Sequence, residues 1–120
     1  MLRFFFLCIA LLFSTYVHHD STIVFAEQKQ TLFVKHLVKG NNVFVECIVD
    51  QFTFTKGTHP KKDGQGRIYI YVNGKRVSET TTAAFVIRGL PVGKHVIRLE
   101  LVHNDASKYN ISHEFTVTIS

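Results

Sequence analysis

The sequence predicts an all-β fold, an antiparallel immunoglobulin-like (Ig-like) β-sandwich of about seven strands. Apolar and polar residues alternate with a period of two in several stretches, most clearly in residues 67–72 and 95–103. Turn-forming residues recur about every 8–12 positions, and beyond the N-terminal apolar run no stretch repeats its apolar residues with a helical period. The Cys…Trp…Cys pattern of antibody domains is missing, so "Ig-like" describes the architecture alone.

The N-terminus has the organisation of a secretory signal peptide. Arg3 precedes the unbroken apolar run FFFLCIALLF at residues 4–13. This run is too short to cross a bilayer, which takes about 20 residues. We expect a signal peptide at residues 1–26, cut after the Val24-Phe25-Ala26 stretch. An earlier cut between residues 14 and 17 and a retained N-terminal anchor are the alternatives.

Residues 27–120 then form one domain, an exported protein without a membrane span in its mature form. The domain keeps a single cysteine, Cys47, so no internal disulfide can stabilise it. The chain carries a net charge of +5, which attracts anionic surfaces such as cell-wall polymers or lipid head groups. Nucleic acid is disfavoured as a partner because of the export signal and because no nucleic-acid-binding motif is present. The oligomeric state is left open.

The first half of the domain predicts two strands. Residues 31–38 alternate, residues 39–42 form a turn, and residues 43–54 form a long second strand. Its apolar positions change parity around Asp50 and Gln51, which indicates a bulge or a break there.

A long loop at residues 55–65 leads to the clearest local signal, a β-hairpin. Residues 66–72 alternate, Asn73-Gly74 is typical of a type I′ turn, and residues 75–77 return alongside.

The remaining strands are expected at residues 80–87, 95–103 and 111–119. They are separated by turns at residues 88–93 and 104–110.

Histidines are the only abundant candidates for metal chemistry. His95, His103, His59 and His113 could supply a copper or zinc site if two or more of them converged. His95 and His103 share a strand face, but eight residues separate them by about 26 Å, so each would need ligands from elsewhere. Structural histidines at strand ends are the favoured interpretation.

No catalytic set is recognisable. The sequence has no Gly-x-Ser-x-Gly elbow, and its acidic residues are scattered. Cys47 lies on an apolar strand face, where a buried structural thiol is favoured over a nucleophile. We therefore expect no enzymatic activity.

Two surfaces are candidates for binding. The loop carries Lys56, Lys61 and Lys62, which could hold an anionic polymer or simply keep the loop soluble. Tyr69 and Tyr71 share a face of the hairpin with Arg67. They form an aromatic platform if that face is open, and the edge of the core if another strand covers it.

Three stretches, GRIYIYVNGK at residues 66–75, PVGKH at 91–95 and LVHNDAS at 101–107, resemble motifs of small uncharacterised exported bacterial β-sandwich proteins. The resemblance implies a sandwich and export. Histidines that look like metal ligands in such relatives correspond here to Arg67, Tyr69 and Ala106. Of that set only His95 remains, with His103 as a substitute nearby.

The leading hypothesis is a secreted or cell-surface binding module without enzymatic activity or cofactor. Its partner is expected to be an anionic or glycan-rich component of the cell envelope. The predicted contacts are Arg67, Tyr69, Tyr71, Lys56, Lys61 and Lys62. The alternative is an exported copper- or zinc-binding protein with a partly degenerate histidine site.

Overall fold

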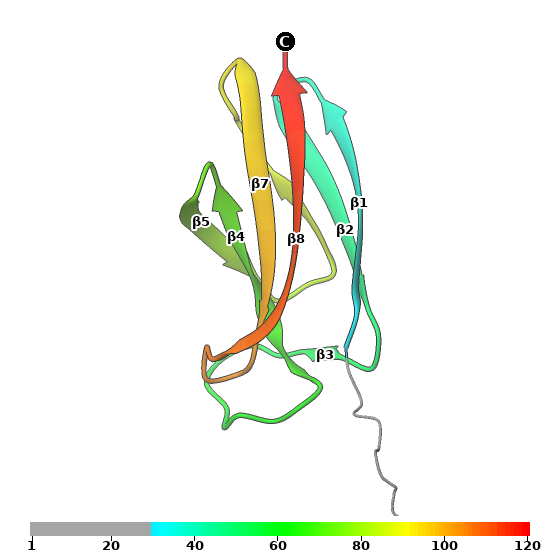
Figure 1. The fold of residues 1–120 in the computed structure, drawn as a ribbon, viewed down its shortest axis with the longest axis vertical. Helices are drawn as coiled ribbons and strands as arrows, with labels where there is room; N and C mark the ends of the chain where they lie inside the picture. Colours follow the sequence, from blue (N-terminus) through cyan, green and yellow to red (C-terminus); the bar gives the residue numbers. More distant parts are fainter. Residues whose placement is uncertain (1–29) are drawn as a thin grey trace, which may run out of the picture.

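The computed structural model describes residues 30–120. The predicted signal peptide at residues 1–26 lies outside the described residues. Two β-sheets face each other, as the sequence predicts for an Ig-like sandwich (Figure 1). The strands are β1 (Leu32–Lys39), β2 (Asn42–Val49), β3 (Thr53–Phe54), β4 (Gln65–Val72), β5 (Lys75–Thr80), β6 (Ala84–Ile87), β7 (Gly93–Val102) and β8 (Lys108–Ile119). Within this part of the chain, no helix is long and apolar enough to cross a membrane.

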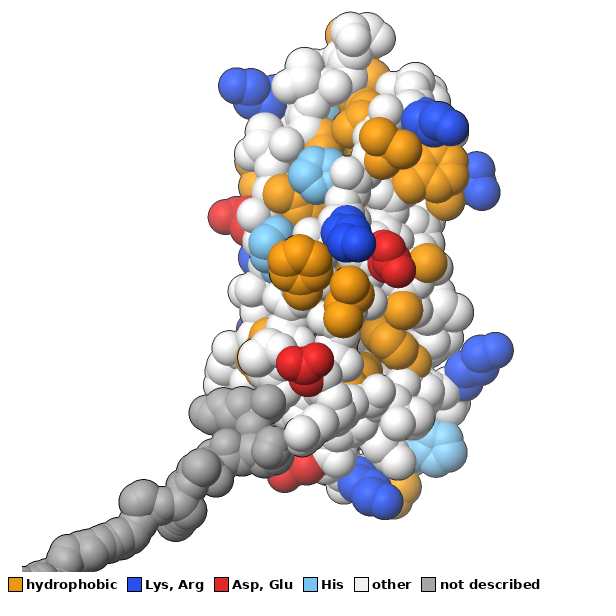
Figure 2. Space-filling view, turned by 90° about the vertical axis from the view of Figure 1, so that its right-hand side faces the viewer, with side chains coloured by type: hydrophobic (Ala, Val, Ile, Leu, Met, Phe, Trp, Pro, Cys, Tyr) orange, Lys and Arg blue, Asp and Glu red, His pale blue; other side chains and the backbone are white. Residues whose placement is uncertain are grey.

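The smaller sheet has the order β1-β2-β6 and is antiparallel throughout. Its inner positions on β2 are Val43, Val45 and Cys47, all buried. The outer face carries exposed hydrophobic side chains, and Figure 2 shows them gathered on this side of the molecule. A solvated sheet face normally carries polar residues, so this face is unusual.

The larger sheet has the order β3-β4-β7-β8, with β5 pairing with the remainder of β4. The predicted single strand at residues 43–54 is wrong. It divides because Gln51 adopts a positive φ of 51°, and the chain then passes to the other sheet, where β3 runs parallel to β4. The parity change at residues 50–51 is this break, and it raises the strand count to eight.

The β4–β5 hairpin turns as expected for a type I′ turn, because Asn73 and Gly74 both have positive φ, 52° and 85°. Strand β5 continues to Thr80, so the predicted strand at residues 80–87 is shortened to β6 (Ala84–Ile87). Strand β8 begins at Lys108, three residues before its predicted start. A register shift between Glu100 and Val102 on β7 accommodates this early pairing.

The core lies between the sheets and is built from the inward positions of the alternating strands. Its most completely buried side chains are Val43, Ile68, Ile97, Leu99, Leu101 and Val102. Cys47 is a free thiol within this core, as predicted. Burial, assisted by the charge of Glu46, raises the pKa of its thiol to about 12, so it is protonated at neutral pH.

Candidate binding surface

The hairpin tyrosines lie on the outer face of the larger sheet, where they are half-buried. Tyr69 pairs with Glu79 on β5 and Glu100 on β7, and Tyr71 pairs with Arg98 on β7. Among the described residues 30–120, no second sheet covers this side of β4 (Figure 1). Of the two arrangements that the sequence allows, the structure therefore has the open face.

Each tyrosine ring is stacked by an arginine. The guanidinium carbon of Arg76 lies 4.2 Å from the ring centroid of Tyr69, and that of Arg98 lies 3.8 Å from the centroid of Tyr71. Such stacking holds the planar guanidinium in place. The edge of Arg98 is already used in part, because its Nη1 donates a hydrogen bond of 3.1 Å to Oε1 of Glu100. The surface is therefore an array of arginines and tyrosine rings rather than a bare aromatic platform, and Glu100 pairs with Arg98 within it.

Arg67 joins this array to the basic loop, residues 55–64. Its Nη2 donates a hydrogen bond of 2.8 Å to the carbonyl of Gly57, and its Nη1 lies 3.5 Å from a carboxylate oxygen of Glu79. Its Nε is buried and, within residues 30–120, has no hydrogen-bond partner. The loop and the tyrosine face are consequently one continuous surface, which Arg67 joins from a largely buried position.

The lysine side chains of the basic loop are exposed to solvent, while carbonyl groups of its backbone form hydrogen bonds within the domain. Lys56, Lys61 and Lys62 are all exposed. The Lys56 carbonyl lies 2.9 Å from Nε2 of His59, and the Lys62 carbonyl accepts a bond from the backbone N–H of Gln65. The loop therefore presents its cations from a fixed backbone.

Two side chains from the β7–β8 region fasten the base of this loop. Asn104 is buried, and its Nδ2 donates to the carbonyl of Pro60 (2.9 Å) and to Oε1 of Gln65 (3.0 Å). Its Oδ1 accepts a hydrogen bond from the hydroxyl of Thr55. A buried amide whose donors and acceptor are all used is a strong positional constraint.

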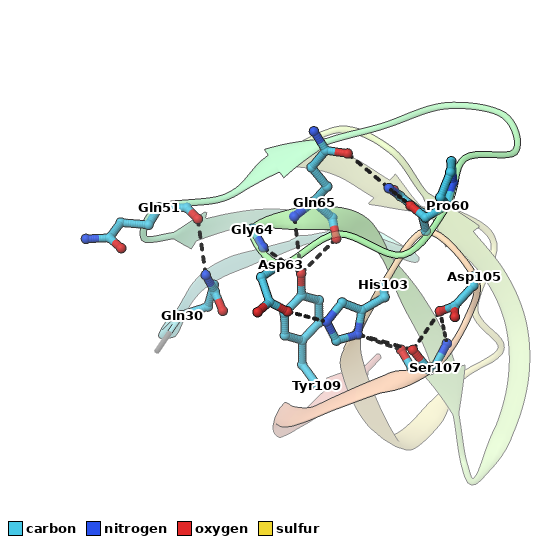
Figure 3. A network of polar contacts seen from close by, with 11 residues as sticks. Gln30, Gln51, Pro60, Asp63, Gly64, Gln65, His103, Asp105, Ser107 and Tyr109 are labelled. Atoms are coloured by element: carbon cyan, nitrogen blue, oxygen red, sulfur yellow. Dashed lines mark hydrogen bonds and ion pairs between the residues drawn. The ribbon is translucent and has the colours of Figure 1, made fainter. Parts of the chain in front are cut away.

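The hydroxyl of Tyr109 is the second fastening. It accepts bonds from the backbone N–H groups of Gly64 (3.0 Å) and Gln65 (3.2 Å) and donates to the carbonyl of Gln65 (2.8 Å), as Figure 3 shows. Partial burial is the main cause that raises the pKa of this hydroxyl. The polar contacts therefore set the start of β4 against β8.

His103 stacks on Tyr109, with ring centroids 3.6 Å apart. Its Nε2 lies 3.2 Å from Oδ1 of Asp63, and its Nδ1 lies 3.3 Å from the hydroxyl of Ser107 (Figure 3). Ser107, His103 and Asp63 thus lie in the order of a serine–histidine–acid triad in the folded protein. Their positions along the chain do not reveal this arrangement. The Ser107 hydroxyl, however, donates a 2.6 Å bond to Asp105, and the Asp63 side chain is 92% exposed. The serine proton is thus directed away from the histidine that would have to remove it.

The hydrogen bonds from Ser107 also explain the state of Asp105. They lower the pKa of its carboxyl group, because they stabilise the charged form. A cleft of about 600 Å³ lies beside this turn, and His103, Tyr109, Asp63 and Lys108 are among its lining residues.

Comparison with known proteins bears on the fold. No family model and no curated protein sequence matches the chain. Among solved structures, the PKD1 domain from the Vibrio cholerae metalloprotease PrtV is similar, with a TM-score of 0.51 and 10% sequence identity. The alignment covers 78% of this chain and 99% of that domain. The similarity shows that the chain has an Ig-like β-sandwich fold.

In this sandwich the candidate ligands His95 and His103 lie at opposite ends of β7. His95 is buried near the start of β7, with Nε2 2.7 Å from the carbonyl of Pro91 and Nδ1 3.0 Å from the side-chain amide of Asn73. His103 lies just beyond the other end of the strand, and His59 lies in the basic loop. His113 is half-buried on β8 opposite Leu99. Across residues 30–120, no group of three or more His, Cys, Asp or Glu residues could hold a metal ion.

Arg76 and Arg98 belong to the candidate binding surface, although the sequence alone does not place them there. Alternation places Arg98 on the outer face, but only the pairing of β4 with β7 sets it against Tyr71. Arg76 reaches Tyr69 because the register shifts between Ile70 and Tyr71, and such an irregularity has no clear local signature.

Proposed function

We propose that the protein is an extracytoplasmic, non-enzymatic binding module that holds an anionic or glycan-rich polymer of the cell envelope. The binding surface consists of the outer face of β5-β4-β7 together with the basic loop. One observation carries the proposal: Arg67, Arg76 and Arg98 are arrayed around Tyr69 and Tyr71 on one open sheet face.

The chemistry of this surface suits phosphate or carboxylate groups spaced along a chain. A guanidinium group presents two parallel N–H donors that match either anion. The arginines come from β4, β5 and β7, and neighbouring strands lie about 4.8 Å apart. Stacking of Arg76 and Arg98 on the tyrosines restricts them before the ligand arrives, which lowers the entropic cost of binding.

Three features support a non-catalytic role outside the cytoplasm. The N-terminal sequence has signal-peptide character, and the chain is basic overall. The similar solved domain is named as one domain of a metalloprotease. The hydroxyl of Ser107, which lies beside His103 and Asp63, has its proton bonded to Asp105 and not to the histidine.

A retention assay tests the proposal with defined polymers. The exported form of the protein is purified from the cells that produce it. It is then passed over purified envelope fractions, immobilised polygalacturonate and immobilised polyol-phosphate teichoic acid. We expect retention at about 50 mM salt and its loss at about 500 mM, because added ions screen exposed charges. Failure to bind any polymer at low salt, or binding that salt does not change, would refute the electrostatic mechanism.

A pair of double variants locates the surface. Arg76→Gln with Lys61→Gln removes one charge from the tyrosine face and one from the basic loop. The control, Lys39→Gln with Arg88→Gln, removes the same number of charges from exposed positions at the end of β1 and after β6. We expect the first pair to weaken retention at least several-fold more than the control. Equal losses would mean that net charge, and not this surface, is recognised.

A further inference from the structure

The outer face of the smaller sheet carries an exposed hydrophobic surface, which we call the apolar face. Its largest members are Phe33 and Leu37 on β1, each 58% exposed, and Phe44 and Ile48 on β2, 41% and 42% exposed. Val86 on β6 lies beside Phe44 in the register. Clustered apolar side chains on a soluble protein commonly mark an interaction site.

The apolar face is arranged in rows across the strands. Phe33 pairs with Ile48 in one row, and Leu37 pairs with Phe44 in another. Between them lies a charged row in which Lys35 pairs with Glu46, and both side chains are exposed. Figure 2 shows a basic and an acidic side chain near the middle of this hydrophobic surface.

This arrangement is complementary to itself. When a two-fold axis runs parallel to the strands between Lys35 and Glu46, each row of one copy faces the same row of the other in reverse order. Lys35 then faces Glu46 of the second copy, and each apolar row covers an apolar row. An in-plane axis perpendicular to the strands would instead place Lys35 against Lys35, which is repulsive.

We propose that the apolar face binds a second copy of this chain in a two-fold symmetric, sheet-on-sheet dimer. Charge complementarity selects the copy and its orientation, and burial of Phe33, Leu37 and Phe44 supplies the driving force. A shallow hollow of about 440 Å³ between Leu37, Phe44 and Val86 gives room for apolar side chains of the second copy. The inference is independent of the proposed polymer binding, because the arginines lie on the opposite sheet.

The size of the face sets the expected strength. Two strands of eight residues and one of four, at about 3.4 Å per residue and about 4.8 Å apart, define roughly 330 Å² on each copy. Stable complexes bury about 800 Å² on each partner, so the dimer should be weak and concentration-dependent. In such a dimer the two arginine faces point outward, so a polymer could be bound at two places.

Sedimentation velocity of the exported protein, from about 10 to 500 µM, tests the proposal. We expect the sedimentation coefficient to rise with concentration from the monomer value toward the dimer value. Lys35→Glu and Glu46→Lys each place like charges opposite one another, and each should weaken association at least tenfold. The double variant Lys35→Glu/Glu46→Lys restores opposite charges and should recover association to within about threefold of wild type.

The control is Lys94→Glu, which makes the same charge change at an exposed position on β7 in the other sheet. It should associate as wild type does. Circular dichroism spectra and thermal melts of every variant establish that the variants are folded. A protein that stays monomeric up to 500 µM, or a charge-swapped double variant that fails to recover, would overturn the proposal. In the first case the apolar face is left for a different protein.

Discussion

Asn73, in the turn of the β4–β5 hairpin, donates a hydrogen bond to the ring of His95 near the start of β7, with 3.0 Å between Nδ2 and Nδ1. The other ring nitrogen of His95 donates to the carbonyl of Pro91, and Oδ1 of Asn73 accepts from the backbone N–H of Val96. The hairpin turn and the turn before β7 are thereby joined at one end of the larger sheet. YVNGK and PVGKH are two of the stretches that resemble motifs of relatives with candidate metal ligands. In this protein Asn73 and His95 of these stretches join two turns by a hydrogen bond.

His95→Ala should lower the free energy of unfolding by about 1–3 kcal/mol, because it removes a buried side chain whose two ring nitrogens bond the Pro91 carbonyl and the Asn73 amide. Urea denaturation followed by circular dichroism measures the loss. His113→Ala, at a half-buried position on β8, serves as the control and should cost less. Equal losses would show that the hydrogen bonds of His95 contribute little.

Metal addition distinguishes between His95 as a metal ligand and His95 as a hydrogen-bonded structural residue. A bound ion at 100 times its dissociation constant would stabilise the fold by about 2.7 kcal/mol. A metal ligand at His95 would have to give up one of its two hydrogen bonds. We therefore expect zinc or copper to leave the melting temperature of the wild type unchanged. A rise that disappears in His95→Ala would restore the metal-binding hypothesis.

Tyr109→Phe should loosen the base of the basic loop while the stacked ring is retained. The hydroxyl accepts from two backbone N–H groups, of Gly64 and Gln65, and donates to one carbonyl. Its removal should cost about 1–3 kcal/mol and speed amide hydrogen exchange at those two residues. Exchange measured by NMR should remain slow in β2, which this contact does not touch. Uniform acceleration across the domain would indicate global destabilisation instead.

Because the thiol of Cys47 is buried, we expect the free energy of unfolding to fall at alkaline pH. Burial raises the pKa of Cys47 from 9.0 to about 12, so between these values the folded state holds a proton that the unfolded state has released. The unfolded state therefore binds fewer protons, and stability falls as pH rises, by at most about 1.4 kcal/mol per pH unit from this group. The contribution is fully present below about pH 9.

Cys47→Ala isolates this contribution, because the other groups that titrate at high pH remain. Urea denaturation at pH 8, 9, 10 and 11 should show wild type losing its advantage over the variant as pH rises. Parallel stability curves would mean that the thiol is not the group responsible. Native Cys47 should also resist alkylation at pH 8 until the chain is unfolded.

The sequence predicts local features, such as turns and strand faces, better than it predicts which strands pair and in what register. The Asn73-Gly74 turn is predictable, because positive φ at both positions depends on these two residues alone. The inward and outward sides of β7 follow from its alternation. The stacking of Arg98 on Tyr71 depends on which strands pair and in what register, and 27 positions of chain separate the two residues. The parity change at Gln51 indicates the break, but not that the chain then joins the other sheet.

Gly66 is the position where the fold tolerates a side chain least. It has a φ of +153°, and a Cβ built there would overlap the backbone carbonyl oxygen of Val102 on the neighbouring strand β7. Gly66→Ala must therefore separate β4 from β7 at the entrance to the hairpin, because backbone cannot move aside as a side chain can. We expect a loss of more than about 3 kcal/mol, or a protein that does not fold.

Gly57→Ala is the matched control. Its φ of +76° is also in the left-handed region, but its Cβ would meet nothing within 4 Å, so only a backbone strain of about 1 kcal/mol applies. If the two variants proved equally stable by urea denaturation, the close approach of β4 and β7 would be disproved.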